Sequence, residues 1–561
     1  MRARLLEAGT LALLVEPGAP RAGDPTDAAA DAAALAAVAE RLRAVPGVVE
    51  VVPGAETLLV RVAAGPVPRA AVRAALEGAP AGTARARTAP AGTTRAGTTA
   101  DLARAPRTVV VPVRYDGEDL AEVARILGTE PAEVVRRHTA ATHRVAFTGF
   151  APGFAYLAGA RGLEVPRRAT PRTRIPAGAV GLAGPYSGVY PRASPGGWQL
   201  VGTTDVPMWD LERDPPALLL PGDEVRFVDA ATLPDPAGRS AADLARDAWS
   251  GVPREATVRP WRRAGSSGLE LVASTAPAAV EDLGRPGLAH LGVTASGALD
   301  PPALRAANRA VGNGPSFACL ELTGSATLRA VGRSTVAVAG AVTRAAVVLE
   351  EGDEITLDAP AHGQHSYVAV RGGIDVPQVL GSASTDLLSG LGPAPVRPGE
   401  IVPVRDVPDD VLGPLRRGAP PRGPRDGPHG PGAGPEDPDV VVVDVVLGPR
   451  DDWFDDESLA RLLAQEWTVT PRLDRVGARL EGPHALVRRE ERAAAELPSE
   501  GVALGALQVP PDGQPVLLLA DHPVTGGYPV VAVVAAADVP RAAQVPPGGR
   551  LRFRRVEQPS A

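Results

Sequence analysis

The spacing of apolar residues in the first part of the chain predicts alternating strands and helices. Five runs follow one another as strand, helix, strand, strand and helix, over residues 10–16, 27–43, 48–53, 57–62 and 69–76. In the first helical run, Leu35, Val38 and Leu42 recur at the spacing that places side chains on one helix face. The order β-α-β-β-α is typical of a ferredoxin-like unit. We therefore expect an N-terminal α+β unit of this kind over residues 1–80.

Short strand-like runs dominate the rest of the chain, which predicts a mostly β protein. A helix is expected to begin at Asp300, as N-cap, with Pro301 in its first turn. The 62 Gly and 60 Pro residues favour turn-rich β structure and linkers. Segments poor in large apolar residues predict linkers at 81–107, 233–267 and 411–439. The units that remain are 108–232, 268–410 and 440–555, and each is expected to be rich in β-strands.

Composition excludes several classes of chemistry. All 58 basic residues are Arg, so a lysine Schiff base, a lysine general base and a phosphate-loop lysine are excluded. The net charge of −7 argues against nucleic acid or an anionic membrane as a partner. The single cysteine, Cys319, excludes an internal disulfide and a cysteine-cluster metal site. A long uncharged apolar run is absent, so we expect a soluble cytoplasmic protein without a membrane span.

Residues 147–205 are the first candidate for a ligand site. Aromatic residues make up 3% of the chain, yet this stretch holds Phe147, Phe150, Phe154, Tyr156, Tyr186, Tyr190 and Trp198. Glycines beside aromatic rings let the backbone approach a ligand that the rings enclose. The candidate substrate-binding residues here are Phe150, Pro152, Gly153, Phe154, Gly196, Gly197 and Trp198. A tightly turned β core is the alternative interpretation of the same pattern.

Two arginines in this stretch are candidates for binding an anion. Arg172 and Arg174 lie two residues apart, so on a strand both guanidinium groups face the same side. Two such groups can hold one carboxylate or phosphate. The alternative is a solvated strand face.

The second half of the chain has its own polar candidates. His290 is flanked by glycine turns, with Asp282 and Ser296 nearby in sequence, which makes it a candidate acid or base; a structural hydrogen bond of a loop histidine is the alternative. A second cluster follows an apolar run at 516–520 and consists of Asp521, Thr525, Gly526 and Gly527. It predicts a ligand rim at a strand end, or else a plain hairpin turn.

A faint internal repeat links the two halves. Residues 176–184 resemble residues 498–506, and each segment is followed by a turn with two glycines and an aromatic residue, at 195–198 and 525–528. The match predicts a β-barrel unit that occurs twice. No metal-binding pattern of the type His-Glu-x-x-His is present.

Longer motifs resemble a known family. Gly-Phe-Ala-Pro-Gly-Phe at 149–154, with residues 170–178 and 194–198, resembles the allophanate hydrolase subunit 1 family, which includes the B subunit of the bacterial three-subunit 5-oxoprolinase. Motifs in the second half resemble the subunit 2 family, which includes the C subunit of 5-oxoprolinase; they lie at 281–287, 296–300, 372–375, 451–454, 481–483 and 521–528. The chain resembles a natural fusion of B and C. One departure is Leu473, where the family has a serine.

The resemblance implies cyclophilin-like β-barrels after the ferredoxin-like unit. It also implies ATP-dependent cleavage of 5-oxoproline to glutamate, shared with a separate A subunit. ATP with Mg²⁺ is the expected cofactor, and Arg172 and Arg174 are expected on the substrate carboxylate or the phosphates. His290, Asp282 and Asp300 are expected to position water, metal or protons, and Arg285, Ser296 and Asp521 to line the substrate site between the two halves.

Two other functions remain open at this point. The same pair of modules resembles the carboxyltransferase portion of urea carboxylase, which would require a detached biotin carrier. The first half also resembles a sporulation histidine-kinase inhibitor, which would make the chain a non-catalytic regulator.

Overall fold

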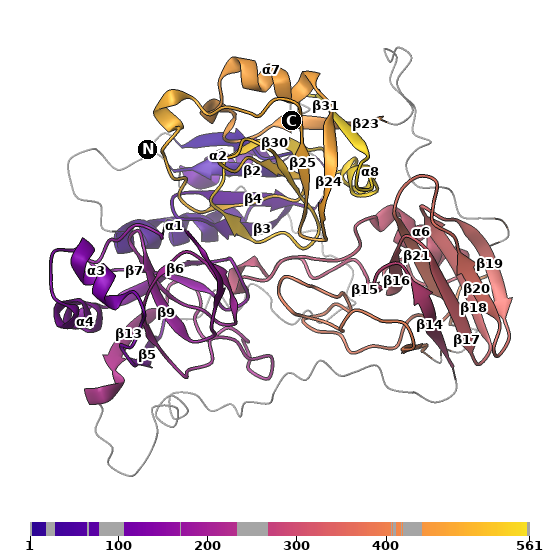
Figure 1. The fold of residues 1–561 in the computed structure, drawn as a ribbon, viewed down its shortest axis with the longest axis horizontal. Helices are drawn as coiled ribbons and strands as arrows, with labels where there is room; N and C mark the ends of the chain where they lie inside the picture. The colour runs from indigo at the N-terminus through magenta and orange to yellow at the C-terminus, as the bar shows by residue number, and fades with distance from the viewer. Residues whose placement is uncertain are drawn as a thin grey trace, which may run out of the picture.

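The chain folds into four units that pack around a common junction (Figure 1). The computed structural model describes residues 3–17, 28–63, 65, 67–77, 106–168, 170–232, 267–405, 407, 411–416, 418 and 440–557. The predicted linkers lie largely outside this part of the chain, at 81–105, 233–266 and 419–439. In Figure 1 the N-terminal unit and the C-terminal barrel share the upper centre, a first barrel lies at the lower left, and a two-sheet unit lies at the right.

The N-terminal unit has the predicted element order with one strand added. Its elements are β1 (Arg4–Glu7), β2 (Ala12–Glu16), α1 (Ala28–Arg43), β3 (Val48–Pro53), β4 (Leu58–Val62) and α2 (Arg69–Leu76). The sheet order is β1-β2-β4-β3, and every pair is antiparallel. The sequence analysis missed β1, whose four residues are too few to show a period. One face of the sheet packs against α1 and α2 around Leu13, Leu42 and Val60.

The first barrel follows. Its elements are β5 (Thr108–Val113), α3 (Leu120–Ile126), α4 (Pro131–Ala140), β6 (His143–Thr148), β7 (Ala155–Ala158), β8 (Arg172–Ile175), β9 (Ala179–Ala183), β10 (Tyr186–Val189), β11 (Ser194–Gly196), β12 (Gln199–Thr203) and β13 (Glu224–Asp229). Seven strands form one sheet in the order β12-β9-β10-β7-β6-β13-β5, and β8 pairs with β11 as a separate hairpin. Arg114 and Thr203 exchange two backbone hydrogen bonds of 2.8 Å, which close the barrel.

The two-sheet unit contains most of residues 267–405. Its elements are β14 (Gly268–Ser274), β15 (Ala279–Glu281), α6 (Pro301–Ala310), β16 (Cys319–Thr323), β17 (Ala326–Val331), β18 (Ser334–Gly340), β19 (Arg344–Leu349), β20 (Glu354–Leu357), β21 (His365–Val370) and β22 (Ile401–Pro403). The described strands form two sheets, β20-β17-β14-β22 and β15-β16-β21-β18-β19, instead of the barrel expected here. Alternating patterns predict strands, but sheet closure depends on which strand edges meet. The Asp300 side chain caps α6 as predicted, accepting a hydrogen bond from the backbone N–H of Ala303.

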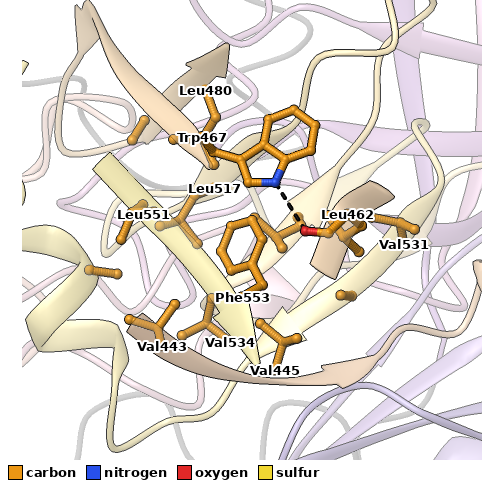
Figure 2. Close-up of a cluster of buried hydrophobic side chains, with 14 of the residues drawn as sticks. Val443, Val445, Leu462, Trp467, Leu480, Leu517, Val531, Val534, Leu551 and Phe553 are labelled. Carbon is orange, nitrogen blue, oxygen red and sulfur yellow. Dashed lines mark hydrogen bonds between the residues drawn. The ribbon is translucent and has the colours of Figure 1, made fainter. Parts of the chain in front are cut away.

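The C-terminal barrel is closed by continuous strand pairing. Its elements are β23 (Val440–Leu447), α7 (Asp456–Ala464), β24 (Trp467–Leu473), β25 (Gly477–Glu481), β26 (Glu500–Gly501), β27 (Ala506–Gln508), β28 (Val516–Leu518), β29 (Thr525–Gly526), β30 (Val530–Val534), α8 (Val539–Ala543) and β31 (Arg550–Arg555). The closed order is β23-β30-β27-β28-β25-β24-β31. Figure 2 shows its interior, where Trp467 and Phe553 lie among aliphatic side chains and the Trp467 indole N–H donates to the carbonyl of Leu462, 3.1 Å away.

The two barrels are copies of one fold. When the strand order from β5 to β13 is compared with that from β23 to β31, each strand of one barrel has a counterpart with the same neighbours in the other. In both barrels the first and last strands pair in parallel. The separate hairpin β8–β11 corresponds to β26–β29. The repeat predicted from the sequence therefore exists. Its first segment was aligned wrongly, because Gly178 before β9 corresponds to Gly505 before β27, both with positive φ, and not to Glu500. A short apolar match cannot fix the register of a strand.

The N-terminal sheet covers the C-terminal barrel. Its second face, with Ala12, Val52 and Leu59, packs against Ala503, Ala506 and Val533. The N-terminal unit therefore packs against the C-terminal barrel, as the adjacent indigo and yellow elements in Figure 1 show. Among the described residues, no helix has both the length and the apolar character needed to cross a membrane.

Candidate functional site

Residues 282–300 form a connecting loop that lies between equivalent turns of the two barrels. The turn between β6 and β7 contacts it from one side, where the backbone N–H of Gly153 donates to the carbonyl of Leu291 at 2.9 Å. The turn between β24 and β25 contacts it from the other side, where Arg475 donates to the carbonyl of Gly297 at 2.5 Å. Segments far apart in sequence, including the stretches predicted as two walls of one site, therefore meet here.

Close packing between segments explains two glycines at this junction. Gly292 has φ +75°, and a Cβ there would lie 2.4 Å from the carbonyl oxygen of Ala151. A Cβ on Gly149 would lie 2.1 Å from the Thr525 hydroxyl. At both positions glycine allows two chain segments to touch, whereas for the stretch that includes Gly149 the sequence analysis expected approach of a ligand.

Two strained residues lie at the same junction. Phe150 and Ser296 are non-glycine residues with positive φ, at +64° and +52°. Phe150 lies in the β6–β7 turn, and Ser296 donates to Asp521 at 2.6 Å, so the two lie on opposite sides of the junction. Strain of this kind persists where surrounding structure enforces it, and it concentrates at functional sites.

The aromatic side chains of 147–205 form a core of their own. Phe147, Phe154, Tyr156, Tyr190 and Trp198 are all buried and pack together on the face of the first barrel that looks toward the junction. The ring centroids of Phe154 and Trp198 are 5.3 Å apart, edge to face, and those of Phe147 and Tyr156 are stacked at 4.2 Å. The rings contact one another instead of enclosing a free space. The structure therefore agrees with the alternative interpretation, a tightly turned β core.

The edge of this aromatic cluster carries the polar groups. Burial raises the pKa of the Tyr156 hydroxyl, against the opposing influence of the Arg167 charge and the Ser499 and Thr525 hydroxyls. Arg167 is exposed, and a Cβ on Gly527 would lie 3.7 Å from its guanidinium. We call Tyr156, Arg167, Ser499 and Thr525 the hydroxyl–arginine rim. It takes two residues from each barrel and combines one exposed cation with three hydroxyls.

Arg172 holds a carboxylate of its own chain. Its guanidinium donates to both Asp119 oxygens, at 2.8 and 3.0 Å, and to Glu118 at 2.9 Å. Arg168 also donates to Asp119, at 2.6 Å. Arg172 thus fastens the β8–β11 hairpin to the start of α3, whereas Arg174 on the same strand is exposed.

The predicted glycines Gly196, at the end of β11, and Gly197, which follows it, belong to this hairpin. Gly196 stands opposite Arg172, and a Cβ on it would lie 2.5 Å from the Tyr190 hydroxyl oxygen. The Gly197 carbonyl accepts from the backbone N–H of Arg168 at 2.8 Å. Gly526, their counterpart in the second barrel, packs against Gln508 and Val502. These glycines lie in the hairpins near the rim.

A buried charge cluster lies where the second barrel meets the two-sheet unit. Arg475 contacts Glu321 at 2.5 Å, Asp521 at 3.1 Å and Glu281 at 3.3 Å. All four side chains are less than a tenth exposed. Ser296 donates to Asp521, and Tyr367 donates to Glu321 at 2.6 Å. One guanidinium thus faces three carboxyl groups in a space closed to solvent.

The carboxyl groups of this cluster differ in the direction of their pKa shifts. Burial raises the pKa of Glu281 well above its usual range, although the Arg475 charge opposes the rise. Burial also acts to raise the pKa of Glu321, but Arg475, His365 and the Tyr367 hydroxyl outweigh it, so the pKa of Glu321 is lowered. Burial lowers the pKa of Arg475, yet the charges of Glu281, Glu321 and Asp521 raise it well above its usual value. The same guanidinium therefore faces one carboxyl group whose pKa is raised and one whose pKa is lowered.

Two predicted polar residues have their groups engaged within the two-sheet unit. The Asp282 carboxylate accepts from the Ser382 and Ser384 hydroxyls at 2.6 and 2.7 Å and from the backbone N–H of Ala383 at 2.8 Å. Arg285 donates to the Ser384 carbonyl at 2.5 Å and lies 3.7 Å from Asp386. These contacts place Asp282 and Arg285 in structural networks, which differs from the catalytic and substrate roles expected of them.

Asp300 is likewise occupied. One of its oxygens caps α6, and the other accepts from Gln544 of the second barrel at 3.0 Å. Each oxygen of this carboxylate already accepts one hydrogen bond, and Asp300 is 1% exposed, which disfavours contact with a substrate or metal. The sequence pattern of an N-cap explains Asp300 without a catalytic role.

His290 has a different setting. It lines a cavity of about 80 Å³ together with Arg43, Glu50 and Gly287. Glu50 of β3 accepts from the backbone N–H of Ala289 at 3.0 Å, which fixes the histidine turn to the N-terminal unit. His290 therefore lies in the wall of a cavity between the N-terminal unit and the connecting loop.

Among the described residues, two cavities have volumes of about 80 and 200 Å³. Both are smaller than the roughly 300–1,000 Å³ usual for drug-sized ligands, so neither of these two cavities has the size of a nucleotide site. The same residues include no group of three or more His, Cys, Asp or Glu side chains that could hold a metal. The chain also has no lysine to place on phosphates.

Sequence reasoning missed five residues of these clusters. Arg167 and Ser499 of the rim carry no motif of their own. Glu281 lies within a family motif, and Arg475 follows Asp474 in the stretch where Leu473 replaces a serine. Similarity to the family could therefore have identified both residues. The isolated signal at Glu321, an acid within an apolar strand, also points to a buried partner.

Comparisons with known families match both halves of the chain. Residues 3–219 match the family described as "Carboxyltransferase domain, subdomain C and D", and residues 291–555 match "Carboxyltransferase domain, subdomain A and B". The crystal structure of TTHA0988 superposes with a TM-score of 0.74 at 32% identity, covering 97% of this chain and 99% of that one.

Curated relatives divide between two subunits of one enzyme. The chain is 33% identical over 306 residues to the C subunit of 5-oxoprolinase from Escherichia coli K12, covering 51% of this chain and 90% of the relative. It is 50% identical over 126 residues to the B subunit of 5-oxoprolinase from Escherichia coli O157:H7, covering 22% of this chain and 58% of the relative. The chain therefore belongs to the carboxyltransferase domain family, as a fusion of regions homologous to the B and C subunits of 5-oxoprolinase.

Proposed function

We propose that this chain is the fused B–C component of an ATP-dependent 5-oxoprolinase, which cleaves 5-oxoproline to glutamate together with a separate A subunit. One observation carries the proposal. Counterparts of both the B and the C subunits are present in one chain, and both barrels hold the same connecting loop, through Gly153 and Arg475. A fusion keeps the two halves at fixed stoichiometry around that junction.

ATP and its metal are assigned to the A subunit in this proposal. The chemistry that ATP supplies is activation of the unreactive lactam carbonyl by phosphorylation. Neither the cavity beside His290 nor the one of about 200 Å³ has the size of a nucleotide site, and the described residues include no group of three or more His, Cys, Asp or Glu side chains that could hold a metal. The expectation that Arg172 holds phosphate is given up, because Asp119 occupies its guanidinium.

The hydroxyl–arginine rim is the proposed binding site for the 5-oxoproline carboxylate. Arg167 supplies the positive charge, and Tyr156, Ser499 and Thr525 supply hydroxyls at the same edge. A hydrogen bond between a guanidinium and a carboxylate contributes roughly 1.5–3 kcal/mol. His290 remains the candidate for proton transfer, because it lines a cavity whose other wall carries Glu50 and Arg43. Asp282 and Asp300 act as positioning residues for the connecting loop and for α6.

The test is turnover by the purified chain with its A subunit. We expect ATP hydrolysis and glutamate formation that require both proteins and 5-oxoproline. Arg167→Met should raise the KM for 5-oxoproline by about tenfold or more, from the lost charged hydrogen bond. Arg226→Met, an exposed arginine on β13, is the matched control and should leave the KM unchanged. Equal KM values for both variants would remove the rim assignment, and no turnover with the A subunit would remove the function.

Carboxyl transfer is the second candidate, favoured by the carboxyltransferase description of the family that both halves match. It requires a biotin-carrying partner. Consumption of carboxybiotin by this chain, with no glutamate formed from 5-oxoproline, would support it over the first proposal. A histidine-kinase regulator, the third possibility, would alter kinase autophosphorylation without turnover of either kind.

A further inference from the structure

The interface between the N-terminal sheet and the C-terminal barrel contains a cavity that the proposed function does not use. Its volume is about 200 Å³, larger than the cavity beside His290. Both units line it, with Arg4, Glu16 and Glu56 from the N-terminal unit and Asp452, Trp453 and Arg492 from the barrel. These residues are separate from the rim and from the charge cluster around Arg475.

Part of the charge in this cavity is already paired. Arg450 donates to Glu16 at 2.5 Å and to Glu500 at 3.0 Å, and Arg4 contacts Glu16 at 3.1 Å. Arg450 and Glu500 are less than a tenth exposed, so this network is a rigid floor that joins the two units. A ligand has little to gain from charges that already have partners.

The remaining charges have opposite signs and are accessible. Arg492, Glu56 and Asp452 are exposed, and none of the three makes an ion pair within the described part of the chain. The guanidinium of Arg492 lies 5.2 Å from the centroid of the Trp453 ring, so the indole orients it. One cation and two carboxylates therefore face a shared space above an apolar ring.

We infer that this cavity binds a small zwitterionic α-amino acid. Arg492 is assigned to the ligand carboxylate, and Glu56 and Asp452 to its ammonium group. A pure anion would meet two uncompensated carboxylates, and a pure cation would leave Arg492 without a partner. At about 30 Å³ per water the volume equals roughly seven waters, which suits an amino acid.

Binding would also strengthen the contact between the two units. Glu56 belongs to the N-terminal unit, whereas Asp452 and Arg492 belong to the barrel, so one ligand bridges them. The same N-terminal unit holds the His290 turn through Glu50. An amino acid in this cavity is thus placed to stabilise the arrangement on which the connecting loop depends.

The first experiment uses three probes that differ by one charged group. L-alanine, propionate and ethylamine are titrated separately into the full chain and followed by saturation-transfer difference NMR, which suits weak ligands. L-alanine should give a saturable signal, and propionate and ethylamine should bind at least about tenfold more weakly, since each lacks one charged contact. No saturable signal for L-alanine overturns the proposal, and equal binding of ethylamine or propionate overturns it in favour of a simple ion site.

The second experiment assigns the signal to this cavity. Arg492→Ala and Glu56→Gln should each weaken L-alanine binding about tenfold or more. Both positions are exposed, so the variants are expected to fold. Arg489→Ala is the matched control, because Arg489 lies three residues away, pairs with Asp456 on the surface and does not line the cavity. Binding by Arg492→Ala and Glu56→Gln at the level of the control places the ligand elsewhere and overturns the proposal.

Discussion

The two barrels fasten the same hairpin with ion pairs of opposite polarity. In the first barrel an acid after the opening strand, Asp119, accepts from Arg172 of β8. In the second a base after the opening strand, Arg450, donates to Glu500 of β26, the counterpart of β8. The position of the tether is shared, and the residue types are exchanged. Two copies of a fold can therefore keep a physical contact while losing the sequence match that would reveal it.

The barrels also differ in where they place aromatic rings. The first barrel has an aliphatic interior apart from Phe227, and its rings lie outside, on the face toward the junction. The second buries Trp467 and Phe553 inside (Figure 2), and its outer face is covered by aliphatic residues of the N-terminal sheet, among them Ala12, Val52 and Leu59. The covering partner explains the difference, because a face that packs against another sheet leaves little room for large rings.

The largest effect is expected at the second barrel's contact with the connecting loop. Arg475→Met removes the only guanidinium that contacts Glu321 and Asp521 in ion pairs within the described residues. Breaking a buried pair from one side costs about 3–5 kcal/mol. We expect the free energy of unfolding in urea to fall by that amount. A change below about 1 kcal/mol would show that the Arg475 cluster contributes little to stability. The β24–β25 turn would then hold the connecting loop no more strongly than a turn without buried ion pairs, such as the β6–β7 turn.

The opposite tethers should differ in strength. Arg450→Met should cost about 3 kcal/mol, because Arg450 and Glu500 are both less than a tenth exposed. Arg172→Met should cost about 1 kcal/mol, because the Arg172 side chain is 18% exposed and Asp119 keeps Arg168 as a partner at 2.6 Å. Urea unfolding of the two variants measures both. Equal losses would show that Arg168 does not compensate for the loss of Arg172.

Closure of the first barrel offers a smaller test. A Cβ on Gly202 would lie 2.4 Å from the carbonyl oxygen of Arg114, at the bridge that closes this barrel. Gly202→Ala should therefore cost about 1–3 kcal/mol through overpacking. Gly197→Ala is the control, since its nearest neighbours would be 3.8 Å from the new Cβ. Calorimetry measures the unfolding of both variants. If Gly197→Ala were less stable than Gly202→Ala, the close contact at Gly202 would be contradicted.

The smallest effect is a dependence on pH. Burial raises the pKa of Glu281 in the folded chain, so its stabilising contribution is present below the unfolded pKa and is lost as pH rises through the folded value. Glu281→Gln mimics the protonated form. Its stability relative to the parent should therefore rise as pH increases above the usual titration range of a glutamate, measured by urea unfolding.

Glu321→Gln is the opposite control for that experiment. The lowered pKa of Glu321 means that its contribution is present above the unfolded pKa and is lost as pH falls. This variant should therefore lose stability relative to the parent at neutral pH. If both variants changed in the same direction with pH, the opposite pKa shifts of Glu281 and Glu321 would be wrong.

Local pattern was sufficient for the elements and for much of the fold class. The spacing of Leu35 and Leu42 marks α1, and Asp300 followed by Pro301 marks the start of α6. The mostly β character and the repeated barrel were also predicted. These features depend on periods and caps within a few residues, which the sequence displays directly.

Of the candidate site, the sequence located the segments but not the role of each side chain. The stretches around Phe150, His290 and Asp521 do meet at one junction. Phe154 and Trp198 face each other, however, and Arg172 faces Asp119. A residue type and its spacing show what a side chain can do, whereas its partner is set by which chain segment packs against it.

The sequence by itself determined the order of strands and helices, the absence of lysine and disulfide chemistry, and the similarity of the two halves to one family. Only the tertiary structure decided which barrel face buries its rings, how each barrel closes, and which charges lose contact with water. Arg475 and Glu321 are 154 residues apart in the chain, and their pairing exists only where the second barrel meets the two-sheet unit. Periodicity is a local property, whereas burial and the pKa values that follow from it are properties of the assembled fold.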